Sequence, residues 1–344
     1  MDVVRLCASK GPRLTTKTRV GAIGAAVAMI FMSGCGGATS PVQGGATWST
    51  PVRVEPNGQS SSSSSVYSVS CPSSTLCVAV DEYGSALIWR GDEWSTPQPV
   101  GAGGTLTSVS CPSTTYCVAV TAGGRAVTYN GQSWSLPVSI GPAATYEVSC
   151  PTVTFCATVG ASGTAGAAST VATFDGHSWS TQQTSSTGAV DDRLMDVSCA
   201  TQSFCVAVNL DGHTLIFDGT KWLPGQSIGP QGLTSVSCPS TTFCMAVVTS
   251  GASTTFQGKS WSTQLAIPGF RAAFARSVSC GSTTRCTAMG LSGQSARWQD
   301  GRWSQPVLVF PGGFLATVAV SCSPSNTCVA VNSKGNAATS MQTA

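Results

Sequence analysis

Short runs of small polar and apolar residues, separated by turn-forming residues, follow one another along most of the chain. In one example unit the β-type runs are 107–111, 117–120, 126–129 and 134–138. Gly123-Gly124 separates the second and third runs, and Asn130-Gly131 is a strong hairpin signal before the fourth. None of these runs has the spacing of an amphipathic helix. The pattern predicts four short antiparallel strands in each unit of about 40 residues.

The unit recurs seven times, and every copy carries two cysteines that stand six positions apart. The pairs are Cys71 and Cys77, Cys111 and Cys117, Cys150 and Cys156, Cys199 and Cys205, Cys238 and Cys244, Cys280 and Cys286, and Cys322 and Cys328. A repeat of this length indicates stacked structural units rather than one irregular domain. The expected fold is all-β, a seven-bladed β-propeller with four-stranded antiparallel blades and one disulfide in each blade.

A tight turn of the form aromatic-x-Gly-x-x-Trp precedes the last strand of most units, as in Tyr129, Gly131 and Trp134. Glycine supplies the positive φ that the turn needs, and the two aromatic side chains can pack across the hairpin. The tryptophans could also be platforms for stacking sugars. Their regular place in the repeat favours structural packing.

The two ends of the repeat array complement each other. A Trp phrase around Trp48 precedes the first cysteine pair, whereas the last pair is followed by 336–341 and no Trp strand. We therefore expect strand 46–54 to complete the seventh blade and close the ring. In this register the Ser-Val-Ser-Cys strand is innermost and the disulfides lie at one rim. The core candidates are the valines two positions before each first cysteine: Val69, Val109, Val148, Val197, Val236, Val278 and Val320.

The N-terminus has the features of an export signal, with five basic residues before an apolar run from Val20 to Met32. Met32-Ser33-Gly34-Cys35 resembles the bacterial lipobox, in which the cysteine receives a diacylglycerol. A plain secretory signal is the alternative. The expected organisation is a lipoprotein signal peptide at 1–34, a lipid-anchored linker at 35–45, a propeller at 46–341 and a tail at 342–344. We expect a monomer held by lipid on the extracytoplasmic face of the cell membrane.

Charge and cysteine usage agree with export. Without residues 1–34 the chain keeps 12 basic and 13 acidic residues, so its net charge is about −1 and gives no support for nucleic-acid binding. Apart from Cys7 and Cys35, every cysteine belongs to a pair, which favours disulfides in an oxidising compartment. The two histidines, His177 and His213, lie outside the pairs, and no metal or cofactor motif is present.

The turns Asp175-Gly176-x-x-Trp179 and Asp218-Gly219-x-x-Trp222 resemble those of the BNR/Asp-box, sialidase-like propellers and of the broader YVTN-type superfamily. The resemblance covers residues 46–341 and implies a propeller fold. The pattern departs from the Asp-box, because one residue between Asp and Gly is missing. Sialidases of this type use an arginine triad and a tyrosine nucleophile, and the scattered arginines of this chain do not match that set. Catalytic residues are therefore not assigned.

The repeats differ most in the third and fourth units. The loop 160–168 is an insertion, and the connection from Trp179 to Cys199 is longer than its neighbours. Three positions before the first cysteine, most units have serine, but these two have Glu147 and Asp196. Ligands of repeat proteins bind where repeats deviate, so the candidate ligand-binding residues are Glu147, Asp196, Asp191, Asp192 and Arg193. Such a carboxylate pair could bind a cation, a basic group or sugar hydroxyls, or act as acid and base; two independently solvated carboxylates are the structural alternative.

The leading hypothesis is a noncatalytic binding or scaffolding module for a cell-envelope glycan, peptide or protein. A sialidase-like glycan hydrolase or lyase and a purely structural envelope protein are the alternatives.

Overall fold

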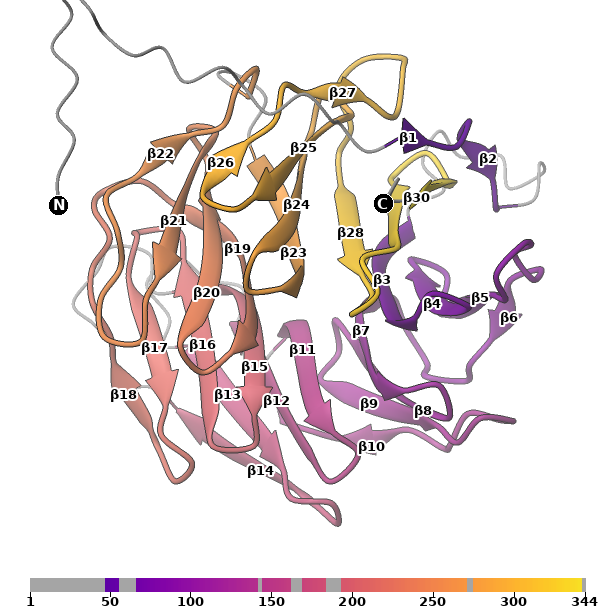
Figure 1. The fold of residues 1–344 in the computed structure, drawn as a ribbon. Helices are drawn as coiled ribbons and strands as arrows, with labels where there is room; N and C mark the ends of the chain where they lie inside the picture. The colour runs from indigo at the N-terminus through magenta and orange to yellow at the C-terminus, as the bar shows by residue number, and fades with distance from the viewer. Residues whose placement is uncertain are drawn as a thin grey trace, which may run out of the picture. The chain divides into compact units, whose positions relative to one another are not determined.

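The computed structural model describes residues 47–55, 66–141, 144–161, 169–183, 193–270 and 275–341. Cys35 and the predicted signal peptide lie outside these ranges. The described residues form strands, turns and loops and contain no helix, so none is long and apolar enough to cross a membrane. The strands form seven separate antiparallel sheets, which are the seven predicted blades (Figure 1).

Each blade has four strand positions, and in the first six blades the strands follow chain order from the inside outwards; the outermost position is divided into two short strands in blades six and seven. The innermost strands are β3 (Val66–Ser73), β7 (Leu106–Ser113), β11 (Ala144–Thr152), β15 (Leu194–Thr201), β19 (Leu233–Ser240), β23 (Ala275–Ser282) and β28 (Val318–Cys322). The second strands are β4 (Leu76–Asp81), β8 (Tyr116–Thr121), β12 (Phe155–Ala161), β16 (Phe204–Asn209), β20 (Phe243–Val248), β24 (Arg285–Gly290) and β29 (Cys328–Asn332). Each innermost strand packs against that of the next blade, and β28 packs against β3, which closes the ring.

The outer half of each blade is less regular. The third strands are β5 (Ser85–Trp89), β9 (Arg125–Tyr129), β13 (Ser169–Phe174), β17 (Thr214–Phe217), β21 (Ala252–Phe256), β25 (Gln294–Gln299) and β30 (Asn336–Met341). The outermost are β6 (Gln98–Pro99), β10 (Val138–Ser139), β14 (Trp179–Gln183), β18 (Trp222–Pro224), β22 (Leu265–Ala266), β26 (Arg302–Trp303) with β27 (Val307–Leu308), and β1 (Thr47–Trp48) with β2 (Val52–Arg53). β1 and β2 both pair with β30, so the N-terminal segment completes the seventh blade as predicted.

The closing segment is two short strands rather than the single strand predicted at 46–54. The backbone N–H of Ser49 donates to the Thr339 carbonyl at 2.8 Å, and the Ser49 hydroxyl accepts from the Thr339 N–H at 3.0 Å. The serine side chain thereby replaces a backbone carbonyl where the chain leaves the sheet towards Pro51, whose ring nitrogen has no hydrogen to donate. Ser95, with Ile88, makes the same pair of bonds in the first blade.

The predicted disulfides are confirmed. All seven cysteine pairs form disulfides within their own blades, and each disulfide joins the first two strands of its sheet. In chain order the bonds join Cys71 to Cys77, Cys111 to Cys117, Cys150 to Cys156, Cys199 to Cys205, Cys238 to Cys244, Cys280 to Cys286 and Cys322 to Cys328. Each bond closes the hairpin between the innermost strand and the second strand, as the spacing of six residues predicts.

The predicted core positions are confirmed as well. The seven core valines are buried, between 4% and 7% exposed. The second strands are buried along almost their whole length, because neighbouring blades cover both faces of each sheet.

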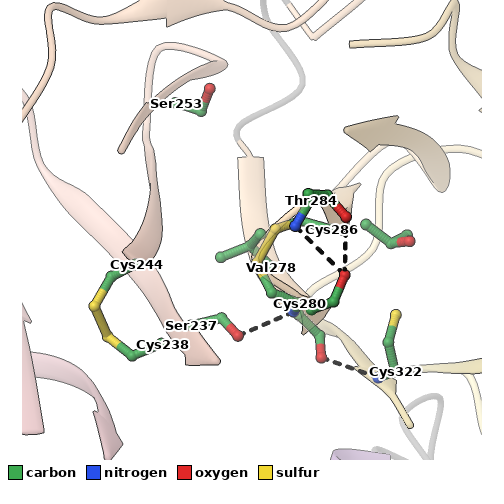
Figure 2. The surroundings of a disulfide bond; sticks show 12 residues. Ser237, Cys238, Cys244, Ser253, Val278, Cys280, Thr284, Cys286 and Cys322 are labelled. Atoms are coloured by element: carbon green, nitrogen blue, oxygen red, sulfur yellow. Dashed lines mark hydrogen bonds between the residues drawn. A yellow bond between two sulfur atoms is a disulfide. The ribbon is translucent and has the colours of Figure 1, made fainter. Parts of the chain in front are cut away.

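A ring of serine hydroxyls joins the innermost strands. The serine before each first cysteine accepts a hydrogen bond from the backbone N–H of the first cysteine in the next blade. Figure 2 shows one such bond, from the N–H of Cys280 to Ser237, at 3.0 Å. The bond from Cys71 to Ser321 completes the circle at 2.9 Å. The serine hydroxyl therefore satisfies a partly buried backbone donor of the neighbouring blade.

Candidate functional site

A second ring of side chains lies two residues earlier on the innermost strands. Here the hydroxyls of four serines each accept from the backbone N–H of a core valine in the next blade; the serines are Ser68, Ser108, Ser235 and Ser277. A register shift just before this position in the first six blades marks a β-bulge, which re-aims the following side chain. Blades three, four and seven carry Glu147, Asp196 and Ala319 at this position.

Asp196 supplies the hydrogen-bond acceptor for the Val197 N–H that Glu147 does not provide. One carboxylate oxygen of Asp196 accepts from the N–H of Val197 on its own strand at 2.7 Å. The other accepts from the N–H of Val236 in the next blade at 2.8 Å, the bond that a serine makes elsewhere. The Ser235 hydroxyl also bonds to this carboxylate. Asp196 is therefore held in place by backbone donors and is not an independently solvated side chain.

Glu147 is the less satisfied member of the pair. Its side chain bonds to the Ser108 hydroxyl, and its backbone carbonyl accepts from Thr158 at 2.7 Å. Burial, followed by repulsion from Asp196, raises the Glu147 pKa to about 8. Burial also raises the Asp196 pKa to about 6, against the lowering effect of its backbone bonds. Near neutral pH the pair therefore holds one proton and one negative charge.

Both carboxyl groups line a cavity of about 540 Å³ in the central channel. Most of the wall consists of serine, threonine and valine side chains from the innermost strands. Arg276, at the start of the innermost strand of blade six, also lines the cavity and lowers the pKa of both carboxyl groups. Thr317 adds a buried hydroxyl oxygen that makes no hydrogen bond within the described structure. The cavity thus combines two carboxyl groups, one guanidinium and a polar wall.

Three other residues were predicted to belong to the site. Asp191 and Asp192 lie outside the described residues, as do the range 184–192 that contains them and the range 162–168 of the blade-three insertion. Arg193 is half-buried and is not among the lining residues. Arg276 is the residue that sequence analysis missed. Within the described lining it is the single arginine, so the arginine triad of sialidases is not assembled there.

The tryptophans and aspartates of the outer turns have structural roles. Trp134, Trp179 and Trp222 each pack against the aromatic residue across their own hairpin, with ring centroids 5.3 to 5.4 Å apart. Asp218 accepts from the hydroxyl of Thr220 and from the backbone N–H groups of Lys221 and Thr220, and these bonds lower its pKa to about 2. Asp175 caps its turn in the same way. The glycine of each such turn has positive φ, as predicted.

Within the described ranges, no group of three or more His, Cys, Asp or Glu side chains is placed to hold a metal ion. Among the described residues, Glu147 and Asp196 therefore do not belong to a group of three possible metal ligands.

The fold and the cavity define the class: a disulfide-clipped, seven-bladed β-propeller with a polar channel site. No family model and no curated protein sequence matches the chain. Among solved structures it is similar to YCF48 bound to D1 peptide, with 14% identity, a TM-score of 0.64, and coverage of 88% of this chain and 98% of that one. It is also similar to the WD40 β-propeller domain of Doa1, with 11% identity, a TM-score of 0.68 and coverage of 87% and 98%.

A third similar structure is YCF48 from Cyanidioschyzon merolae, with 14% identity, a TM-score of 0.63 and coverage of 85% and 98%. At these identities the likeness establishes the propeller fold. The relation to Asp-box, sialidase-like propellers stays a prediction from the sequence.

Proposed function

We propose that this protein is an extracytoplasmic, lipid-anchored binding module that holds a peptide or protein partner at the channel cavity. The observation that carries the proposal is the Glu147–Asp196 pair, which occupies positions that are serine in four other blades and lines a cavity of about 540 Å³. A carboxyl group with a raised pKa is an unfavourable replacement for a serine that would complete the ring. Such a replacement is expected where binding requires the charge.

The chemistry of the wall favours a partner that presents a basic side chain. A lysine or arginine side chain can displace the shared proton and pair with both carboxylates, while Thr317 and Arg276 offer donors to backbone carbonyls. A glycan fits less well, because the ring serines already accept backbone N–H bonds and the tryptophans are packed within hairpins. One similar propeller was solved with a bound peptide, which is consistent with this choice.

The location rests on the sequence. The basic and apolar N-terminal segment and Met32-Ser33-Gly34-Cys35 support export and lipid attachment, and the seven disulfides fit an oxidising compartment. From Cys35 to Trp48 the linker reaches at most about 45 Å, which would keep the propeller close to the membrane.

A peptide-binding measurement tests the proposal. The full lipidated chain, in detergent, is probed with immobilised peptides that differ only in one central lysine, alanine or glutamate. We expect lysine peptides to bind best and the double variant with Glu147→Gln and Asp196→Asn to lose that preference. Equal binding of the three peptides, or an unchanged preference in the double variant, would refute the site. Mass spectrometry after metabolic labelling with an alkyne fatty acid tests the anchor, with Cys35→Ser as the control.

A further inference from the structure

A second pair of carboxyl groups lies outside the lining of the cavity, where the closing segment meets the first blade. Glu55 is the last described residue after β2, and Asp81 ends β4. Glu55 is 6% exposed and Asp81 is 1% exposed. The two side chains hydrogen-bond to each other. Since two carboxylates cannot form such a bond without a proton, one of them is protonated in this arrangement.

Asp81 has a structural task that needs no charge. One of its carboxylate oxygens accepts from the backbone N–H groups of Tyr83 at 2.9 Å and Ser85 at 2.7 Å, which fixes the turn between the second and third strands. Asn209 makes the corresponding pair of bonds in the fourth blade, and Asn332 does so in the seventh. A neutral amide is therefore sufficient for the turn.

Glu55 lies at the end of the closing segment. This segment is held by two-residue pairings, Thr47–Trp48 and Val52–Arg53, by the bond from the Val54 N–H to the Gly335 carbonyl at 2.9 Å, and by the bond from the Trp48 indole N–H to Ser295 at 2.9 Å. Val54 is buried in a core cluster that includes blade-one residues, and the Glu55 side chain adds a polar contact with blade one through Asp81. Because one carboxyl oxygen of Glu55 is buried without a hydrogen-bond partner, ionisation at this place is strongly unfavourable.

The surrounding charges do not offset the effect of burial on the Glu55 pKa. Asp81 and Glu82 from the blade-one turn disfavour ionisation of Glu55, and Arg53 on its own strand favours it less strongly than burial opposes it. The Glu55 pKa is raised to about 7, and burial raises the Asp81 pKa as well. The shared proton is therefore lost near neutral pH.

We propose that the Glu55–Asp81 pair is a proton-dependent latch on the closing segment of the propeller. With the proton in place, the carboxyl bond holds the segment against blade one. When both groups ionise, their repulsion favours opening of the segment and exposure of β30, the edge strand that it covers. The latch is independent of the proposed function at the cavity.

Hydrogen exchange of the full chain tests the latch directly. The backbone amides of Ser49 and Val54 donate across the closing segment, so their protection factors report its opening. A carboxyl group whose folded pKa is raised stabilises at low pH, and that stability is lost as pH rises through the folded value. We expect protection of both amides to fall about tenfold to a hundredfold between pH 5 and pH 8, after correction for intrinsic exchange rates.

Two variants separate the latch from other effects. Glu55→Gln keeps a donor to Asp81 without titrating, and Asp81→Asn reproduces the residue that blades four and seven use. Each variant keeps one buried carboxyl group but removes the repulsion between two carboxylates. In both, we therefore expect protection to fall less with pH than in the unmodified protein, while the amides of β14 in blade three behave as in the unmodified protein. If protection falls with pH in both folded variants as much as in the unmodified protein, the latch is overturned. Calcium-dependent protection at pH 8 that both variants lack would overturn it too, because the pair would then be a cation site.

Discussion

Replacing Glu147 by serine should make the propeller more stable, and more so at high pH. The change gives blade three the residue found at this position in blades one, two, five and six. The change removes a carboxyl group whose pKa is raised by burial and by Asp196. The N–H of Val197 keeps its acceptor, because the Asp196 carboxylate already accepts from it at 2.7 Å.

The magnitude follows from the pKa of the Glu147 carboxyl group, which rises from an ordinary 4.5 to about 8 in the folded protein. The folded state then holds its proton more tightly, so its stability is highest at acid pH and falls as pH rises from about 4.5 to about 8. We expect the gain from Glu147→Ser to be about 2 kcal/mol larger at pH 8.5 than at pH 5, allowing for coupling to Asp196.

Equilibrium urea unfolding followed by tryptophan fluorescence, with the disulfides intact, measures this difference. The matched control is Ser277→Glu, which introduces the carboxyl group in blade six and removes the acceptor of the Val320 N–H, now bonded at 3.1 Å. It should lose stability, and more so at pH 8.5. The reasoning is refuted if Glu147→Ser is less stable than the unmodified protein at pH 8.5, or if its gain is the same at both pH values. Lysine-peptide binding should weaken in Glu147→Ser although its fold is more stable.

Three further outcomes follow from the ring and its closure. Ser237→Ala removes the acceptor of the Cys280 N–H and should lower the free energy of unfolding by about 1 to 2 kcal/mol in the same urea assay, whereas Ser237→Thr should keep most of it. Ser49→Ala should increase hydrogen exchange at Thr339 about tenfold or less, with amides in blade three unchanged. Complete reduction of the unfolded chain should add the mass of 14 hydrogens; any other increment contradicts seven bridges.

The repeat made the fold predictable. Each blade must bury both faces against similar neighbours, so the same core valine and the same small residues recur in every unit. Closure could be predicted because a propeller leaves no unpaired edge, and the orphan Trp phrase at the N-terminus fits the strand that the last unit lacks. The break in the closing segment could not be predicted. It depends on Ser49 replacing a backbone carbonyl, a local bond that hydrophobic spacing does not encode.

The site was predictable only where it departs from the repeat. Glu147 and Asp196 stand at a position that is serine in four other blades, so the sequence alone singles them out. The different hydrogen bonding of Glu147 and Asp196 could not be predicted from the sequence. Asp196 accepts two backbone N–H groups that belong to different blades, and this geometry exists only after the bulges have re-aimed the side chains.

Sequence analysis missed Arg276 because its position varies among the repeats. Its position, four residues before the first cysteine, holds Tyr67, Thr107, Met195 and Thr234 in other blades, so there is no repeated residue from which an arginine could depart. Its influence on Glu147 comes from the closed ring, which directs the start of blade six into the same channel as blades three and four. A deviation from the repeat therefore identifies the carboxyl groups that replace ring serines. The Arg276 guanidinium near them can be identified only from the three-dimensional arrangement of the blades.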